Sequence, residues 1–176
     1  MKRISFLVVL LGIGLIVSLS AQDTEIVGFG GLNIGMSFAQ IDEQLPATGL
    51  FRYRGESDVS FSPGRDRKVL EIDGYDFVQR GILQFVDDQL FSITLIINPA
   101  RMDHFSLFTR FRDQYGEPNS FGPQRIIWEG SRTRLTLERP LTVQYLDRER
   151  FMQQLDESRA EESLRHISRE LFLEQF

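Results

Sequence analysis

The feature that most constrains the fold is a helical segment followed by a series of short strand-like segments, an order that occurs twice along the chain. Residues 37–45 and 99–115 have helical patterns, and each is followed by short segments bounded by turn residues. Helices and strands grouped in this way are typical of α+β folds. We therefore expect an antiparallel sheet built from two helix-then-strand-meander units, with the helices packed on one face.

The first helix has clear start and stop signals. Ser37 is placed as the N-cap, and Gln40 follows at the spacing of a capping box. Met36, before the cap, can pack against Ile41 as a hydrophobic staple. Pro46 cannot continue a helix, so we expect the helix to end there.

The second helix has two possible starts. Asn98-Pro99 would place a proline at the first helical position, whereas Asp103 would be a later N-cap. Gly116 is placed just past the end, and Pro118 reinforces the stop. A broad apolar face is expected from Phe105, Leu107, Phe108, Phe111 and Tyr115.

The strands are predicted from alternation and from turn residues. They are expected at 50–54, 69–73, 77–86, 90–97, 125–129, 132–138 and 141–146, with a glycine-punctuated extended segment at 24–34 and a turn at 63–66. The Asp87-Asp88-Gln89 segment predicts a tight hairpin. Because residues 90–97 are apolar on both faces, we expect a central strand covered by a helix on one face.

The C-terminal segment, residues 148–176, contains no Gly or Pro and predicts a third helix. Phe151, Met152 and Leu155 form one apolar patch, and a second patch consists of Leu164, Ile167, Leu171 and Phe172. Residues 156–163, between the patches, contain no large apolar side chain. Two alternatives follow: the helix breaks near 158–163, or its distal half extends past the domain toward a partner.

The first twenty residues have the layout of a secretory signal peptide. Lys2 and Arg3 precede an apolar run, residues 4–19, and small residues precede a cut after Ser20. The run is short for a spanning helix, so we expect cleavage, with an uncleaved anchor as the alternative. The chain has no Cys, which excludes a lipoprotein anchor and disulfides. We expect a periplasmic or secreted protein with a signal at 1–20, one domain at 21–147 and a C-terminal helix at 148–176.

Charge and composition exclude several functional classes. The formal charge of −5 becomes −7 without Lys2 and Arg3, which argues against binding to nucleic acid and to anionic membranes. The two histidines, His104 and His166, do not form a two-histidine metal motif, and thiolate sites need cysteine. No nucleophile elbow of the form Gly-x-Ser-x-Gly is present. We therefore expect no cofactor, no metal and no catalytic residues.

Three residues of the second unit are candidates for partner binding. Arg132 and Arg134 fall on one face of their predicted strand, where they can recognise an anionic partner or pair with carboxylates such as Glu129 and Glu138. Trp128 is either a core residue or a binding anchor.

Several segments resemble those of small exported bacterial α+β modules. They are Ile34-Gly35-Met36-Ser37, Phe105 with Phe108, Tyr115-Gly116-Glu117-Pro118, Trp128-Glu129-Gly130, Arg134-Leu135-Thr136-Leu137, and Val143 with Tyr145 and Asp147. The chain is similar here to the small lipoproteins of outer-membrane assembly and to the proteinaceous β-lactamase inhibitors. It departs from the lipoproteins and from the disulfide-bearing inhibitors because it lacks Cys. The resemblance implies a binding or scaffolding module.

Our leading functional hypothesis is a non-enzymatic periplasmic protein that acts by protein–protein interaction in the envelope. The residues to test first are Leu164, Ile167, Leu171 and Phe172. One alternative is a periplasmic carrier that holds a small apolar ligand in an aromatic cavity between helix and sheet. Another is a hydrolase that uses dispersed acidic residues. We expect an envelope protein as partner and no stable membrane insertion after signal cleavage.

Overall fold

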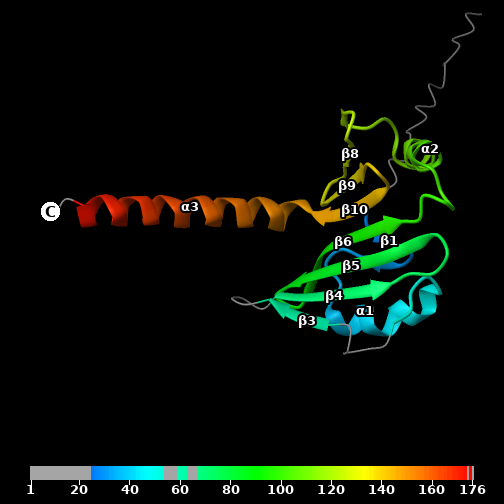
Figure 1. Cartoon of the computed structure of the whole chain (residues 1–176), viewed down its shortest axis with the longest axis horizontal. Helices are drawn as coiled ribbons and strands as arrows, with labels where there is room; N and C mark the ends of the chain where they lie inside the picture. The colour runs from blue at the N-terminus through cyan, green and yellow to red at the C-terminus, as the bar shows by residue number, and fades with distance from the viewer. Residues whose placement is uncertain (1–24, 54–58, 63–66, 174, 176) are drawn as a thin grey trace, which may run out of the picture.

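The computed structural model describes residues 25–53, 59–62, 67–173 and 175. The predicted signal peptide and the predicted turn at 63–66 lie outside these residues. Within them, an antiparallel sheet is packed by helices and followed by a long C-terminal helix, which confirms the predicted α+β fold (Figure 1).

The sheet of the described residues has eight strands in the order β3-β4-β5-β6-β10-β9-β8-β7, each antiparallel to its neighbours. Each unit supplies four consecutive strands. The first supplies β3 Val59–Ser62, β4 Arg67–Asp73, β5 Val78–Val86 and β6 Gln89–Ile97, and the second supplies β7 Ser120–Phe121, β8 Arg125–Glu129, β9 Thr133–Glu138 and β10 Thr142–Asp147. The last strands of the two units, β6 and β10, pair in the middle of the sheet. This arrangement confirms the prediction of two helix-then-meander units and of 90–97 as a central strand.

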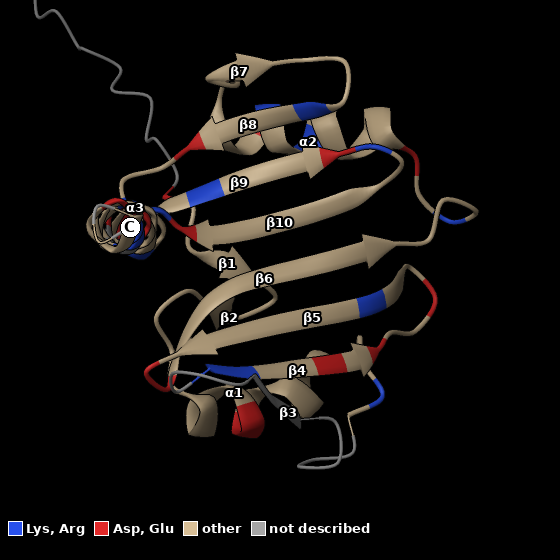
Figure 2. Ribbon diagram, turned by 60° about the vertical axis from the view of Figure 1, so that its left-hand side comes forward, with Lys and Arg blue, Asp and Glu red and all other residues tan. Residues whose placement is uncertain are grey.

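Each unit begins with a helix, α1 Phe38–Gln44 or α2 His104–Tyr115, and both helices lie behind the sheet in Figure 2. The predicted capping box of α1 is present, because the Ser37 side chain accepts from the backbone N–H of Gln40 and the Gln40 side chain accepts from Ser37. A 3₁₀ turn, Leu45–Thr48, follows α1 and contains Pro46 near its start. The chain therefore leaves α-helical geometry next to the proline, as expected.

The later of the two predicted starts holds for the second helix. Asp103 is the N-cap of α2 and accepts from the backbone N–H of Ser106 at 2.9 Å. The earlier start is wrong because the Asn98 side chain forms a turn, in which it accepts from the N–H of Ala100 and donates to the carbonyl of Asp76. Gly116 ends the helix with a positive φ of 80°, which glycine adopts without strain.

The core lies between the helices and the facing side of the sheet. Alternate side chains of the strands point into it, among them Leu83, Ile93, Leu135, Leu137 and Val143. Phe38 of α1 packs edge-on against Phe85 at 5.3 Å, and Phe111 of α2 packs edge-on against Trp128 at 5.7 Å between ring centres. These contacts place one helix over each half of the sheet.

Several local predictions differ from the structure. Residues 50–54 do not form a strand over their described part, where Phe51 makes only an isolated bridge to Gly74. The extended segment before α1 is a short hairpin, β1 Gly28–Phe29 and β2 Leu32–Asn33. Strands β3 and β7 were not expected, because they are short edge strands that mix polar and apolar residues. Phe105, predicted on the buried face of the second helix, is 73% exposed because it lies at the first turn of α2, beyond the core.

The C-terminal helix, α3 Arg148–Leu173, is continuous over 26 residues. At 1.5 Å per residue it is about 39 Å long. Figure 1 shows that it leaves the domain at the end of β10 and extends away from it, and in Figure 2 it is seen end-on beside the ends of β9 and β10. The alternative of a break near 158–163 is therefore wrong, and the helix extends past the domain.

None of the described helices is both long enough and apolar enough to cross a membrane.

Candidate functional site

The first turn of α3 is anchored by a buried carboxylate at the end of β10. Asp147 is 1% exposed, and one of its carboxylate oxygens accepts from the backbone N–H of Arg150 at 3.1 Å, as a helix cap does. Its other oxygen accepts from Nε and Nη2 of Arg132 at 3.2 and 3.0 Å. The Asp147 carboxylate thereby joins the end of β10 to the start of α3, and both of its oxygens accept hydrogen bonds.

Two hairpin turns hold the same helix start from either side. Arg148 donates to the carbonyl of Gly130 in the β8–β9 turn at 2.5 Å. Arg150 donates to the carbonyl of Val86 at 2.8 Å and to the Gln89 side chain at 2.7 Å, both in the β5–β6 hairpin. Because one turn comes from each unit, the direction of α3 is set by both halves of the sheet.

A third group of contacts surrounds Glu129 on β8. This carboxylate lies 2.8 Å from Nη2 of Arg134 and 2.7 Å from Nε of Arg148. The Arg134 guanidinium also stands over the ring of Phe151 in the first turns of α3, at 5.9 Å. We refer to these contacts and those of Asp147 as the α3 anchor.

The anchor changes the interpretation of the two candidate arginines. Arg132 and Arg134 lie on one face, as predicted, while Thr133, Leu135 and Leu137 are buried on the other. Both guanidinium groups are paired with carboxylates of the chain itself, which favours the alternative of paired side chains over recognition of an anionic partner. Their role in this structure is to position α3.

Of the two alternatives for Trp128, the structure shows a core residue, and the alternative of a binding anchor is wrong. Its side chain is 1% exposed and packs against Phe111 and Phe108 of α2. The indole Nε1 donates to the carbonyl of Gly116 at 2.9 Å, which ties β8 to the end of α2. A partner has no access to this ring.

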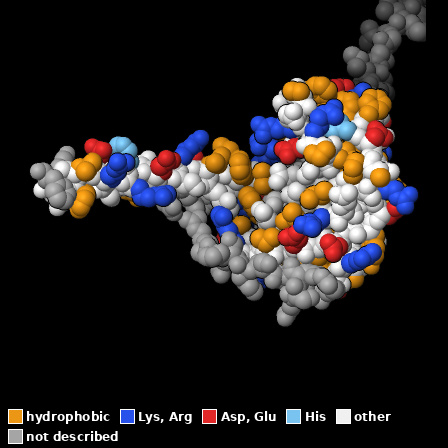
Figure 3. Space-filling model, viewed as in Figure 1, with side chains coloured by type: hydrophobic (Ala, Val, Ile, Leu, Met, Phe, Trp, Pro, Cys, Tyr) orange, Lys and Arg blue, Asp and Glu red, His pale blue; other side chains and the backbone are white. Residues whose placement is uncertain are grey.

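The far half of α3 carries the other four candidates. Leu164, Ile167, Leu171 and Phe172, defined here as the distal apolar surface, are 64%, 54%, 57% and 59% exposed. The spacing of Leu164, Ile167 and Leu171 places them on one side of the helix, with Phe172 next to them. Figure 3 shows hydrophobic and charged side chains interleaved along α3 beyond the domain. More than half of each of these four side chains is therefore open to solvent.

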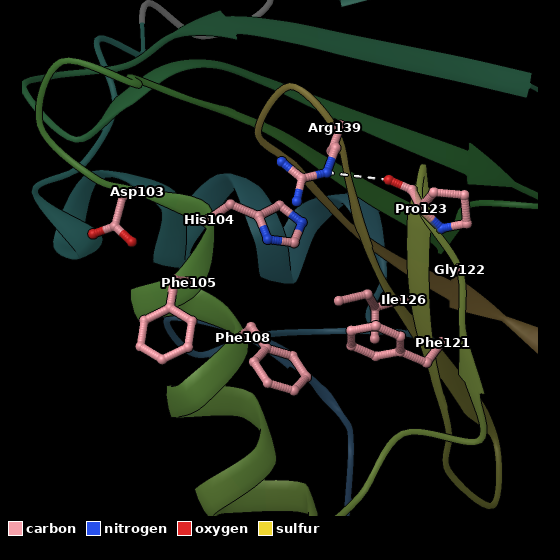
Figure 4. A pocket seen from close by; sticks show the side chains of 9 residues that line it. All are labelled: Asp103, His104, Phe105, Phe108, Phe121, Gly122, Pro123, Ile126 and Arg139. Atoms are coloured by element: carbon pink, nitrogen blue, oxygen red, sulfur yellow. Dashed lines mark hydrogen bonds between the residues drawn. The ribbon is translucent and has the colours of Figure 1, made fainter.

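A hollow of about 460 Å³ lies between the start of α2, strands β7 and β8, and the β9–β10 turn (Figure 4). Its lining residues are Asp103, His104, Phe105, Phe108, Phe121, Gly122, Pro123, Ile126 and Arg139. Burial lowers the pKa of His104, the charge of Arg139 lowers it further, and Asp103 acts in the opposite direction. The ligand-carrier hypothesis expected an aromatic cavity between helix and sheet, and this hollow is open at the surface instead.

Asp76, Asp87 and Asp88, which are among the dispersed acidic residues of the chain, occupy turns. Asp76, Asp87 and Asp88 have positive φ angles, which Asp tolerates better than most residues do. Asp76 pairs with Arg101 at 2.7 Å, and Asp88 pairs with Lys68 at 2.8 Å. Among the described residues, no group of three His, Cys, Asp or Glu side chains could hold a metal ion.

Two neighbouring tyrosines, the buried Tyr145 and the half-buried Tyr115, have raised pKa values. Burial, followed by the neighbouring Tyr115, raises the pKa of the Tyr145 hydroxyl well above its usual range. Burial likewise raises the pKa of Tyr115. Both hydroxyls therefore stay protonated at neutral pH.

The fold and the anchored helix define an α+β domain of two meander units with a projecting C-terminal helix. The chain belongs to the TP0088 domain family, which it matches over residues 27–157, more than half of its length. The match includes the sheet, α1, α2 and the α3 anchor, and it ends before the distal apolar surface. No curated protein and no solved structure matches the chain.

Proposed function

We propose that this is a non-enzymatic protein of the bacterial envelope that binds another protein through the distal apolar surface. The observation that carries the proposal is the exposure of Leu164, Ile167, Leu171 and Phe172 at 54–64% on a helix that leaves its own domain. Large apolar side chains gathered on one exposed surface mark interaction sites. The predicted signal peptide supports a location outside the cytoplasmic membrane.

The α3 anchor supports the proposal because a fixed helix loses less conformational freedom on binding than a flexible tail does. Asp147 and Glu129 hold the first turn of α3 through four arginines, Arg132, Arg134, Arg148 and Arg150. The polar stretch 156–163 then separates the distal apolar surface from the domain. A partner can therefore approach this surface without contacting the sheet.

The spacing of the exposed residues indicates the chemistry of the partner. Leu164, Ile167 and Leu171 follow the i, i+3, i+7 pattern of helices that insert into an apolar groove. Charged residues that flank this surface on α3, including Arg165 and Glu170, are suited to a polar rim. We therefore propose a protein that presents an apolar groove.

Replacing Leu164, Ile167 and Leu171 together by alanine is expected to weaken partner capture at least 100-fold. Three buried apolar anchors account for a loss of this size, and alanine keeps the helix intact. The measurement is quantitative pull-down from an envelope fraction, followed by affinity measurement on the purified partner.

The matched control changes Ser158 and Glu162 to alanine, on the side of α3 that faces away from Leu164 and Leu171. This variant should capture the same partner with unchanged affinity. Equal capture by both variants would contradict the proposal. Formation of a homodimer that the first variant abolishes, with no other protein captured, would show that the surface serves self-association instead.

A further inference from the structure

The hollow at the start of α2 combines an aromatic surface with a cationic end. Phe105 and Phe121 are 73% and 70% exposed, the highest values among the large apolar side chains of the described residues. Phe121 packs edge-on against Phe108 at 5.6 Å, and Phe108 lies 6.1 Å from the ring of Trp128 in the core. Ile126, a core residue, completes the apolar lining. The aromatic surface of the hollow therefore packs directly on the core.

Arg139 is held at the other end of the hollow by contacts that orient it. Its Nε donates to the carbonyl of Pro123 at 3.1 Å, and its backbone N–H donates to the carbonyl of Gln124 at 2.9 Å. Figure 4 shows the guanidinium next to the ring of His104, above the phenylalanine rings. The terminal nitrogens of Arg139 are thus placed to bind an anionic group that enters the hollow.

The nearby carboxylate of Asp103 has its own partner. It accepts from the backbone N–H of Ser106 at 2.9 Å and from the Ser106 hydroxyl at 2.6 Å, as the cap of α2. The lowered pKa of His104 favours its neutral ring, so Arg139 supplies the positive charge at this end of the hollow. A single positive charge suits a ligand with a single negative charge. A second negative charge would be repelled by Asp103.

We propose that this hollow binds small free carboxylates that have an aromatic body, with the carboxylate on Arg139 and the ring against Phe105, Phe108 and Phe121. Its volume of about 460 Å³ lies in the range of small-molecule sites. Arginine binds carboxylates through charge-assisted hydrogen bonds, and phenylalanine rings pack favourably against an aromatic ligand. The site is separate from the distal apolar surface and does not depend on the function proposed for it.

The test is calorimetric titration of the full mature chain with 4-phenylbutyrate and with its neutral amide, 4-phenylbutyramide. The carboxylate should bind, and the amide should bind at least about tenfold more weakly, as expected for the loss of one charge-assisted hydrogen bond. Arg139→Gln should weaken carboxylate binding by a similar factor and leave amide binding unchanged. The matched control, Arg125→Gln on the opposite face of β8, should bind the carboxylate as the wild type does.

A second measurement reports on the position of the bound carboxylate. NMR titration should show a His104 pKa below the usual histidine value, and 4-phenylbutyrate should raise it because a bound anion favours the protonated ring. Phe121→Ala should lower the affinity severalfold without changing the unfolding temperature, since this ring is 70% exposed. Because the bound anion favours the protonated His104 ring, the carboxylate should bind more tightly as the pH falls through the His104 pKa, down to the pH at which the ligand carboxylate is itself protonated.

Three results would overturn the proposal. The first is no binding of 4-phenylbutyrate at millimolar concentration. The second is equal binding by wild type and Arg139→Gln. The third is a dimer of the wild-type chain that Phe121→Ala dissociates, which would assign the hollow to a protein interface.

Discussion

Replacing Trp128 by alanine is expected to lower the free energy of unfolding by about 3–5 kcal/mol, the range measured for deleting a buried aromatic ring. The side chain is 1% exposed and lies between β8 and the two rings of Phe108 and Phe111 on α2. Its removal would leave a cavity under α2 and would also leave the carbonyl of Gly116 without the indole donor. Few single changes in this domain should destabilise it more.

Urea denaturation followed by circular dichroism measures this effect, because Trp128 is the single tryptophan and its fluorescence disappears in the variant. Trp128→Phe is the matched control. It fills most of the volume but lacks the N–H donor, so the expected loss is smaller, about 1–3 kcal/mol. A loss below 1 kcal/mol for the alanine variant would contradict the placement of this ring in the core.

Replacing Asp147 by alanine is expected to lower the free energy of unfolding by about 2–4 kcal/mol. Removal of one partner from a buried ion pair costs about 3–5 kcal/mol, and removal of a helix cap costs about 0.5–2 kcal/mol. The estimate is below the sum of these values because the Arg132 side chain is 49% exposed and can regain water.

The same change should also loosen α3. Hydrogen exchange of the backbone amides at the start of α3 should become faster in Asp147→Ala, while exchange in β5 and β6 should follow only the global stability. Asp147→Asn keeps a cap acceptor and removes the charge, so it should be intermediate. Asp113→Ala on exposed α2 is the control and should change stability by less than about 0.5 kcal/mol. Unchanged exchange at the start of α3 would show that Asp147 does not anchor the helix.

Local signals in the sequence predicted the helices and the central strands well. The capping box at Ser37, the cap at Asp103 and the stop at Gly116 each depend on residues within one turn, so a single sequence can reveal them. The alternating strands of the two units were also predicted, because one face of each strand is buried. Strands β3 and β7 were missed, since their pairing depends on neighbouring strands more than on their own residues.

The α3 anchor could be predicted only in part. The alternation in β9 indicated that Arg132 and Arg134 share a face, but Asp147 lies fifteen residues further along the chain from Arg132. Their contact depends on the register of β9 against β10, in which Asp147 lies opposite Thr133. The one available signal was an acid directly before a helical pattern, at the position of an N-cap.

The hollow could not be predicted because its residues come from three separate segments. Phe105 was predicted on the buried face of the second helix, Phe121 lies in the two-residue strand β7, and Arg139 lies in the β9–β10 turn. The continuity of α3 was also left open, because a polar stretch without Gly or Pro is compatible with both a break and a solvent-exposed helix. In the structure, the helix passes through solvent and needs no core contact there.

The most direct test of the account is site-specific photo-crosslinking on α3 in cells of the source organism. A photoreactive phenylalanine analogue placed at Leu171 lies on the distal apolar surface, and the same analogue at Glu162 lies on the opposite side of the helix. We predict one discrete crosslinked protein from position 171 and none from position 162. Equal crosslinking from both positions, or none from position 171, would contradict a docking role for the distal apolar surface.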